Sequence, residues 1–276
     1  MKINFYKKIN PWVALLVIVL TVGGFCLGFF GGPRWVNNDE QETVVGSSEN
    51  CNIKIIPLTG ALATYYDLTD SGYAYSDEIV SQIEDANKNE RIKAIVLEID
   101  SYGGYPVAGE EVLNALKNSG KETVALIRQS GLSAAYMAAI GANTIFASKF
   151  SDVGSIGVTT SYVDNANKNK TEGLVFNQLS SGKYKDMMDP DKSLTEEEKA
   201  LIMRDIELAH DDFVNLVAKH RKLSVERVGQ IADGSSMLGE MALKNGLIDK
   251  IGGINEVKEY LKDKLDIELI ICEEEF

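Results

Sequence analysis

Residues 129–158 read QSGLSAAYMAAIGANTIFASKFSDVGSIGV and carry the clearest structural signal in the chain. The preceding segment 123–127 (TVALI) is apolar and largely β-branched, as in a buried strand, whereas residues 134–139 (AAYMAA) favour a helix. Ser133 is therefore predicted to lie where a strand passes into the first turn of a helix. Unpaired backbone N–H groups and the positive end of the helix dipole gather there, and both stabilise a developing oxyanion.

Two interpretations of Ser133 are open at this point. The hydroxyl could be a nucleophile, or it could only cap the helix, because serine is among the preferred N-cap residues. A nucleophilic hydroxyl needs a base, and the two histidines, His210 and His220, fall within one predicted helix and not in a loop or at a strand end. We expect both to be solvated and on different faces of that helix, so they are not expected to share a metal ion.

Lysine is the other recurrent partner of a nucleophilic serine. The short segment 181–186 (SGKYKD) offers Lys183 and Lys185. A lysine base must be neutral, and the ordinary lysine pKa of about 10.4 must fall by several units for that. By spacing alone, both lysines are typical of surface charge.

The remaining pattern alternates strands with helices, which predicts an α/β domain with helices covering a largely parallel sheet. Residues 152–157 are predicted to form a loop, and residues 164–173 a polar stretch. Strands are predicted at 53–58, 94–99, 123–127, 144–147 and 267–272, and helices at 76–87, 106–116, from 133 onward, 194–222 with a capping box of Thr195 and Glu198, 224–231, 238–245 and 255–264.

The N-terminal region has the composition of a membrane anchor. Residues 11–32 carry no charge and are long enough to cross a bilayer core. Three lysines precede this segment and one arginine follows it, so the positive-inside rule places the N-terminus in the cytoplasm and the rest outside. The expected domains are a cytoplasmic N-terminus (1–10), a transmembrane helix (11–32), a linker (33–52) and an extracytoplasmic domain (53–276).

Charge and cysteine content narrow the partners. The first 36 residues hold four basic and no acidic residues, so the remainder holds 24 basic against 41 acidic residues, a net charge of −17. This balance argues against nucleic acid. Three cysteines are too few and too scattered for a zinc site or a disulfide framework. Cys51 and Cys272 flank the predicted domain and could pair outside the cytosol, and we leave this open.

Six motifs, in order, resemble the signal peptide peptidase A family, the Ser-Lys serine peptidases of the Clp/crotonase fold. The similarity runs from about Ile53 to Tyr260. The motifs are Asp100-Ser101-x-Gly103-Gly104, Ser133-Ala-Ala-Tyr136 running into Ile145-Phe-Ala147, Gly154-Ser155-Ile156-Gly157-Val158, Gly182-Lys-Tyr-Lys185-Asp186, Ala232-Asp233-Gly234 and Gly239-x-x-Ala242-x-x-x-Gly246-Leu247-Ile248-Asp249.

The resemblance implies a Clp/crotonase-like spiral of β-β-α units and a role for each matched site residue. Ser133 would be the nucleophile and Lys185 the general base, with Lys183 a bystander. Ser155 would hydrogen-bond the lysine. Gly103 and Gly104 would form the oxyanion hole together with the N–H beside Ser133, that of Ala134.

By the same resemblance, the protein would be a membrane-anchored endopeptidase that cleaves apolar peptides, such as remnant signal peptides, without metal or organic cofactor. It would form a ring-like homo-oligomer, for example an octamer, with the dyad shared between subunits. Two departures concern the site: the family usually has Ser-Gly-Gly at Ser133-Ala134-Ala135, so a narrower pocket is expected, and proline at Tyr102. Two alternatives are a crotonase-like acyl-CoA enzyme and a catalytically inactive peptide-binding membrane scaffold.

Overall fold

The computed structural model describes residues 45–46, 51–65 and 72–272. The described residues all belong to one compact unit, Thr43–Phe276. The predicted transmembrane helix at 11–32 lies outside the described residues. Among the residues that are described, no helix has both the length and the apolar character that crossing a membrane requires.

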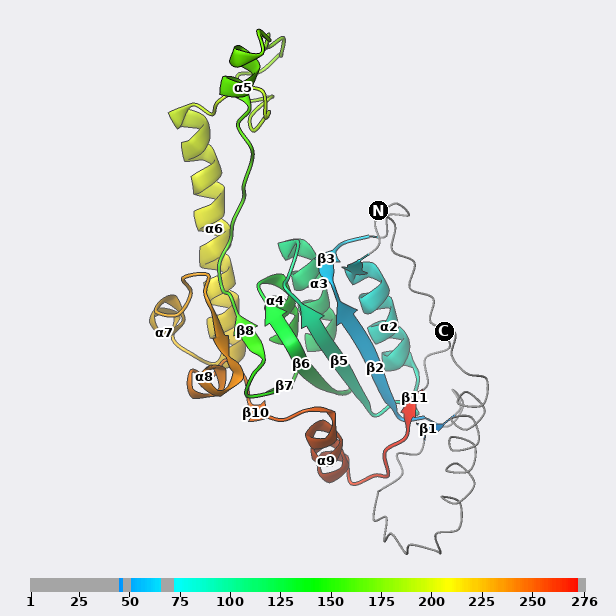
Figure 1. The fold of residues 1–276 in the computed structure, drawn as a ribbon. Coiled ribbons are helices and arrows are strands. Elements are labelled where there is room, and N and C mark those ends of the chain that lie inside the picture. The colour runs from blue at the N-terminus through cyan, green and yellow to red at the C-terminus, as the bar shows by residue number, and fades with distance from the viewer. Residues whose placement is uncertain (1–44, 47–50, 66–71, 273–276) are drawn as a thin grey trace, which may run out of the picture. The chain divides into compact units, whose positions relative to one another are not determined.

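The described unit is built around one parallel sheet (Figure 1). Its main path runs β1-β11-β2-β5-β6-β7-β10, and all neighbours on this path are parallel. The strands are β1 (Val45–Gly46), β11 (Ile271–Cys272), β2 (Ile53–Thr59), β5 (Ala94–Ser101), β6 (Glu122–Leu132), β7 (Thr144–Ala147) and β10 (Lys250–Ile251).

Four short strands lie near the carboxyl ends of β5 and β6. β8 (Asp152–Gly154) pairs in parallel with the last residues of β6, beyond the part of β6 that pairs with β7. β9 (Ser236–Leu238) pairs antiparallel with β8. β3 (Ala61–Ala63) and β4 (Tyr73–Tyr75) form a separate two-stranded parallel sheet. These short pairs surround the carboxyl ends of β5 and β6.

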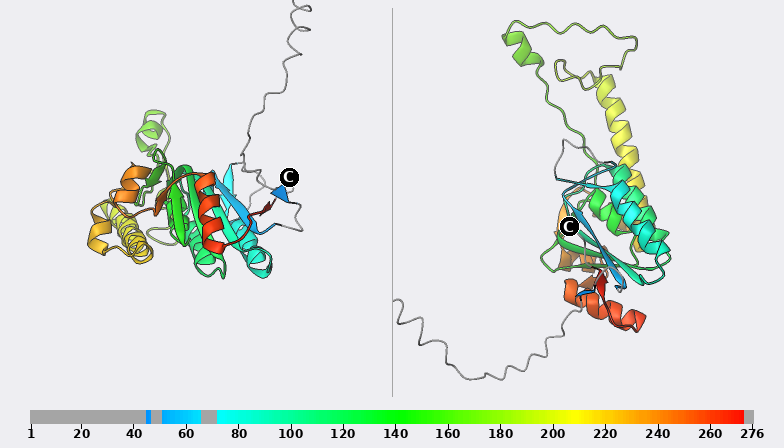
Figure 2. Two further views of the ribbon diagram at one scale, coloured as in Figure 1. Left: turned by 90° about the horizontal axis from the view of Figure 1, so that it is seen from below. Right: turned by 90° about the vertical axis from the view of Figure 1, so that its right-hand side faces the viewer.

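Helices cover both faces of the sheet, as the views in Figures 1 and 2 show. On β5, Ile95, Leu97 and Ile99 belong to the larger core cluster, while Ala94 and Val96 belong to a smaller cluster on the opposite face. Burial on both faces explains why this strand is a continuous apolar run. The larger cluster includes residues of α2 (Ser76–Lys88), α3 (Pro106–Lys117) and α4 (Ala134–Ala139), and the smaller one residues of α9 (Ile254–Leu265).

The predicted α/β class is confirmed, with three differences in detail. The predicted loop at 152–157 contains β8, the predicted strand at 267–272 is reduced to β11, and the polar stretch 164–173 contains the short helix α5 (Ala166–Thr171). Strand β6 also runs to Leu132, because residues 130–132 pair with β8. Pairing of this kind depends on a tertiary neighbour, which local periodicity does not show.

Residues 159–212 form what we call the arm: an extended segment, α5, a long loop and the N-terminal part of α6 (Glu196–Arg221). Of these described residues only Glu198 is buried, whereas Phe213, Val214, Val217 and Ala218 anchor the other end of α6 in the core. At 1.5 Å per residue, the start of α6 stands about 25 Å from its first core residue. Figures 1 and 2 show α5 and its loops at this distal end.

Two smaller helices, α7 (Val225–Gly229) and α8 (Gly239–Lys244), follow α6. The chain then returns to the sheet through α9 and β11, where Cys272 forms a disulfide with Cys51. The two cysteines are 221 residues apart, and the bond fixes the last strand beside the start of β2. The pairing that the sequence left open is therefore present.

Candidate active site

Ser133 lies at the turn between β6 and α4 in a backbone conformation unusual for serine. Its φ is 52° and its ψ is −124°. A positive φ costs a non-glycine residue about 1–3 kcal/mol and persists only where the surroundings enforce it. Here its N–H donates to the Gly154 carbonyl at 2.8 Å, and its own carbonyl accepts from the Met137 N–H at 2.9 Å. β8 and α4 thus hold the serine from both sides.

The hydroxyl of Ser133 does not cap the helix. Ser133 occupies the N-cap position of α4, yet its side chain makes no capping hydrogen bond. The interpretation of this serine as a helix cap only is therefore wrong. The residue is half-buried, so its side chain keeps contact with solvent. A strained, uncapped and accessible serine is typical of a nucleophile at a strand-to-helix turn.

The loop after β5 packs directly against this serine. Gly103 has a φ of +101°, and a Cβ built on it would lie 2.8 Å from the Cβ of Ser133 and 2.8 Å from the Leu132 carbonyl oxygen. Ser101 fixes the loop, because its Oγ accepts from the Gly103 N–H at 3.0 Å and donates to the Gly60 carbonyl at 2.6 Å. No side chain larger than hydrogen fits at Gly103, and its N–H is already engaged.

Gly104 forms an isolated bridge with Leu62 on β3. The Leu62 N–H donates to the Gly103 carbonyl at 2.9 Å, and the Tyr105 N–H donates to the Leu62 carbonyl at 2.8 Å. This bridge leaves the Gly104 N–H without an acceptor among the described residues. Ala134 is the first residue of α4, so its N–H has no partner within the helix either. The Gly103 N–H is engaged by Ser101, so the N–H of Gly104 is the one available to an oxyanion. The N–H of Ala134 is available as well.

The two alanines after the serine are buried. Ala134 and Ala135 are 2% and 0% exposed and belong to the larger core cluster. The narrower pocket expected from these alanines stays a prediction. A Cβ built on Gly109 of α3 would lie 2.6 Å from the Ala134 carbonyl oxygen, so the two helices are in close contact. Tyr136 is also buried, donates to the Leu247 carbonyl at 2.8 Å, and has its pKa raised by burial.

Ser155, expected to hydrogen-bond the lysine, has a different partner within this chain. Its φ is 51°, and its Oγ donates to the Gly234 carbonyl at 2.9 Å. Its N–H donates to the Ser235 carbonyl at 3.1 Å. Two segments that matched family motifs, around Gly154 and around Gly234, are therefore in direct contact beside β8. A bond from Ser155 to Lys185 is not formed within one chain.

Lys185 lies on the arm, in the loop before α6, and is exposed. Within the described residues its ammonium group has no hydrogen bond or ion pair. An ion pair between Lys183 and Glu197 ties this loop to the first turn of α6, about 25 Å from where that helix enters the core. One chain therefore does not bring Lys185 to Ser133.

Lys183 is the less suitable base of the two lysines. Its hydrogen bond with Glu197 raises the pKa of the Lys183 ammonium, and the Tyr184 ring lies 5.1 Å from the same nitrogen. A lysine held in its charged form cannot accept a proton.

A charged cluster that the sequence did not predict supports the loop beside Lys185. The Lys192 ammonium lies 2.6 Å from Glu198 Oε1 and 3.5 Å from Asp186 Oδ1, with side-chain exposures of 17%, 3% and 16% respectively. Glu198 also completes the predicted capping box with Thr195, which is confirmed. The sequence pattern predicted only the capping box and not the ion pairs, because Lys192 and Asp186 come from an irregular loop without periodicity.

The sequence predicts that both histidines are solvated, but the structure shows both partly buried. His210 Nε2 lies 2.8 Å from the Ala232 carbonyl oxygen, and the pKa of His220 is lowered, chiefly by burial and also by Lys117. In the described part of the chain, no group of three or more histidine, cysteine or acidic residues is arranged to hold a metal ion.

The chain is similar to known proteases. Residues 115–268 match Peptidase family S49. "Putative protease MJ0651" of Methanocaldococcus jannaschii is 35% identical over 245 residues, which cover 87% of this chain and 73% of that protein. "Putative signal peptide peptidase SppA" of Enterococcus faecium is 28% identical over 251 residues, covering 88% of this chain and 71% of that protein.

A solved structure of a ClpP1 mutant from Listeria monocytogenes aligns with a TM-score of 0.48 and 13% identity, covering 73% of this chain and 92% of that one. The family match spans more than half of the sequence, and the archaeal relative is aligned over most of both chains. The chain belongs to peptidase family S49.

Proposed function

We propose that this protein is a serine endopeptidase that cleaves peptide bonds by acyl transfer through Ser133. Family membership supports peptidase activity, and the geometry of one residue supports the serine type. Ser133 combines a strained backbone, an uncapped hydroxyl and partial exposure with two neighbouring N–H groups that lack backbone acceptors, those of Gly104 and Ala134. This arrangement is the observation that carries the proposal.

In the proposed reaction, Ser133 Oγ attacks the carbonyl carbon of the peptide while its proton passes to a neutral lysine. The negative charge that develops on the carbonyl oxygen is stabilised by the N–H groups of Gly104 and Ala134. The carbon–nitrogen bond then breaks, and the lysine gives its proton to the leaving amine. Water attacks the resulting ester, which releases the acid and restores the Ser133 hydroxyl.

We assign the base to Lys185 of a neighbouring copy, since the same chain holds its own Lys185 far from Ser133. The surface of the arm supports assembly. It exposes apolar side chains, among them Val163, Val175 and Leu179 at 70%, 78% and 98%. Exposed apolar surface of this kind is typical of a protein interface. A ring-like homo-oligomer, for example an octamer, would bring each arm to the next subunit.

Residues 11–32 serve in this proposal as a single membrane helix, with the peptidase domain outside the cytoplasmic membrane. The disulfide between Cys51 and Cys272 supports that location, because such bonds persist mainly in oxidising compartments. The finer fold assignment, a Clp/crotonase-like spiral, follows from the motif resemblance. The substrates would be apolar peptides such as remnant signal peptides.

The test is a digest of casein and of a synthetic signal peptide by the full-length protein in detergent, read by mass spectrometry. The parent should produce new peptides and Ser133→Ala none. An inactive scaffold would bind the peptides without cleaving them, and a crotonase-like enzyme would bind an acyl-CoA instead. Cleavage that persists in purified Ser133→Ala would rule out Ser133 as the nucleophile.

A further inference from the structure

Arg221, the last residue of α6, makes three directional contacts at the core end of this helix. Its side chain is only 8% exposed. Its Nε donates to the Gly246 carbonyl at 2.9 Å, and its Nη1 and Nη2 donate to the two carboxylate oxygens of Asp249 at 3.0 and 2.7 Å. The helix ends immediately afterwards, because Lys222 has a left-handed φ of 57°. A planar guanidinium held at three points fixes the orientation of its helix as well as its position.

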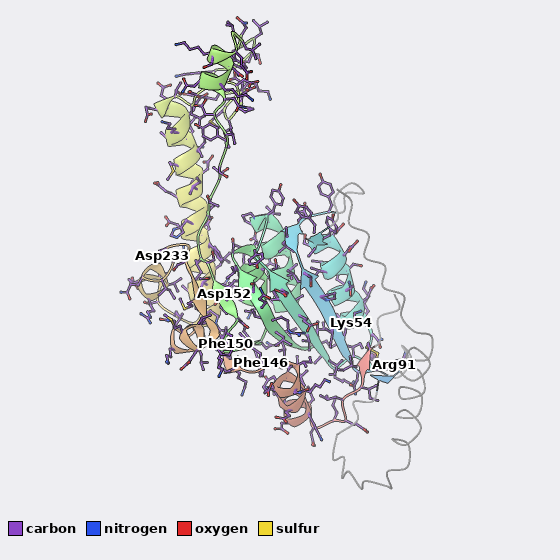
Figure 3. The ribbon with its side chains drawn as sticks, viewed as in Figure 1. Lys54, Arg91, Phe146, Phe150, Asp152 and Asp233 are labelled. Atoms are coloured by element: carbon purple, nitrogen blue, oxygen red, sulfur yellow. A yellow bond between two sulfur atoms is a disulfide. The ribbon has the colours of Figure 1, made fainter. Side chains whose placement is uncertain are left out.

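Asp249 is tied in turn to strand β7 of the main sheet. Its N–H donates to the Ile145 carbonyl at 2.9 Å, and its Oδ2 accepts from the Ile145 N–H at 2.8 Å. Phe146, which follows Ile145 on β7, marks this part of the sheet in Figure 3. Arg221 and Asp249 therefore join the end of α6 to a strand of the sheet.

The core residues at this end of α6 hold the helix in a less directional way. They are apolar and comprise Phe213, Val214, Val217 and Ala218. Burial of apolar surface stabilises the helix against the core, but the hydrophobic effect is non-directional. The tilt of α6 is therefore set more sharply by the bonds of Arg221 than by this packing.

The length of α6 amplifies any change of tilt. The helix has 26 residues, which span about 39 Å at 1.5 Å per residue. A tilt of about 5° at Arg221 would move the start of a helix of this length by roughly 3 Å, which is as long as a hydrogen bond. The loop that carries Lys185 moves with this start, because Lys183 is paired with Glu197 in the first turn of α6.

We propose that Arg221 is a positioning residue, which sets the direction of the arm through Asp249 so that Lys185 reaches Ser133 of the neighbouring copy. This inference rests on the proposed function, since it takes Lys185 as the base and a neighbouring copy as the place where it acts. A general base must lie within about 3.2 Å of the group whose proton it accepts. Arg221 acts on this distance through the arm alone.

The segment that accepts the bonds of Arg221 also supports the serine of the same chain. The Tyr136 hydroxyl donates to the Leu247 carbonyl at 2.8 Å, and Tyr136 belongs to α4, the helix that follows Ser133. Loss of Arg221 would therefore act on the arm, on the serine of its own chain, or only on stability. These three roles predict different results in mixed rings.

The test places Arg221→Met in one or the other partner of a shared site. In the first mixture, Ser133→Ala/Arg221→Met copies supply the lysine and Lys185→Ala copies supply the serine. In the second mixture, Arg221→Met is moved to the Lys185→Ala copies, which supply the serine. Both are compared with the mixture that lacks Arg221→Met. We expect kcat to fall by about 100-fold in the first mixture, as a displacement of about 1 Å can cause, and to stay within a few fold in the second. Equal losses in both mixtures, or a loss in the second alone, would overturn the proposal.

Arg204→Met is the matched control for the first mixture. Arg204 is also on α6, but its pair with Asp205 is exposed, at 60% and 62%, where such pairs contribute little. Its kcat should match that of the mixture without it. Thermal unfolding and tagged subunits show whether each variant folds and enters the rings.

Arg221→Lys keeps the proposal testable if Arg221→Met fails to fold. It retains the charge and the apolar stem but replaces the planar fork with a single ammonium. Its kcat should fall less than that of Arg221→Met, and again in the first mixture alone. A loss of the same size in the second mixture would count against a role through the arm.

A second measurement follows the arm without relying on cleavage. Nitroxide labels are attached at Gly120→Cys and Met203→Cys in the full-length protein with Cys26→Ala, and labelled subunits are diluted with unlabelled ones. Gly120 is exposed with no atom within 4 Å of a built Cβ, and Met203 is 48% exposed on α6. The remaining cysteines are joined in the disulfide.

Pulsed electron paramagnetic resonance then gives the distance between the two labels. Arg221→Met should shift or broaden this distance, and Arg204→Met should leave it unchanged. An unchanged distance in Arg221→Met would overturn the positioning role. If the mixture without Arg221→Met is inactive in proven mixed rings, the shared site fails, and the label distance still decides whether Arg221 sets the direction of the arm.

Discussion

Gly103 lies so close to Ser133 that a methyl group on its Cα would stand 2.8 Å from the Cβ of the serine. The same methyl would lie 2.8 Å from the Leu132 carbonyl oxygen, and the φ of +101° is itself unfavourable for alanine. Gly103→Ala therefore has to displace either the serine or the loop that carries the Gly104 N–H. We expect kcat/KM for peptide cleavage to fall by about 100-fold or more, the loss typical of one displaced oxyanion donor.

Gly120→Ala is the control for this prediction. A Cβ built on Gly120 meets no atom within 4 Å, and the residue is exposed. Its kcat/KM should match that of the parent, and thermal unfolding of both variants shows whether Gly103→Ala is still folded. Full activity in a folded Gly103→Ala protein would contradict the contact described above.

The two lysines of the arm are expected to differ sharply. Lys183 is paired with Glu197, which raises its pKa and keeps it charged, whereas Lys185 has no ion pair among the described residues. Lys185→Met should reduce kcat by several orders of magnitude, as loss of a catalytic base does, and Lys183→Met should be mild. Rates of peptide cleavage with pH give the test, and the parent should gain activity as pH rises.

A histidine base would give a different result in the same assay. His210→Gln combined with His220→Gln should keep turnover within a few fold of the parent, with the same dependence on pH. If the folded double variant is inactive, or if Lys183 proves to be the essential lysine, the assignment of Lys185 as general base is wrong.

Sharing of the site between subunits predicts complementation. Ser133→Ala and Lys185→Ala should each be inactive, but mixed rings contain some sites with an intact serine from one copy and an intact lysine from the next. Random mixing of equal amounts makes about a quarter of the sites complete in a cyclic assembly. Cleavage should recover to roughly that fraction after co-assembly, which is shown by tagged subunits. No recovery in proven mixed rings would refute the shared site.

Much of this arrangement could be predicted from local patterns. The apolar run of β5, the helix starts at Ser76 and Pro106, and the N-cap of α6 at Thr195 each follow from residues a few positions apart. The position of Ser133 at a strand-to-helix turn follows for the same reason. The motif resemblance pointed to Gly103 and Gly104, in the loop after β5, as residues of the oxyanion hole. It did not show which of their two N–H groups is available to an oxyanion.

What sequence patterns could not show depends on contacts between distant segments. β8 forms because residues 130–132 and 236–238 pair with it on either side. The distance between Lys185 and Ser133 arises because α6 is anchored in the core only from Phe213 onward. A cavity lined in part by Tyr73, Tyr75 and Tyr105 likewise joins β3, β4 and the start of α3, and no spacing along the chain brings these together.

The cluster of Lys192 and Glu198 should position the loop that carries Lys185. Lys192→Met leaves the nearly buried Glu198 carboxylate without its ammonium partner, so the arm tip should loosen. We expect a lower kcat with little change in KM, and recovery with Lys192→Arg. Lys199→Met is the matched control, because its pair with Glu196 lies on the exposed surface, where such pairs contribute little. Equal kcat values for Lys192→Met and Lys199→Met would argue against the positioning role.

The same cluster predicts how the arm responds to acid. The hydrogen bond from Lys192 lowers the pKa of Glu198, so the ion pair stabilises the folded arm above the ordinary glutamate pKa of about 4.3. That contribution is lost as pH falls through the lowered pKa. Pepsin should therefore cleave the arm of the parent increasingly as pH falls below about 4, while Lys192→Met is cleaved more readily at higher pH as well. Identical cleavage profiles for the two proteins would contradict the assigned pair.

The disulfide between Cys51 and Cys272 should contribute directly to stability, because it closes almost the whole peptidase domain into one loop. The separation of 221 residues is long, and a native disulfide of this kind typically contributes about 2–4 kcal/mol by restricting the unfolded chain. Cys51→Ser with Cys272→Ser should lower the urea midpoint of the full-length protein in detergent, and a reductant should lower the parent to the same value. The reductant should leave the double variant unchanged.

The oxidising location predicts a second result in cells. Alkylation of cells before lysis should leave Cys51 and Cys272 unmodified, because both sulfurs are held in the disulfide. Equal midpoints for parent and variant, or free thiols at both positions in cells, would contradict both the bond and the location inferred from it.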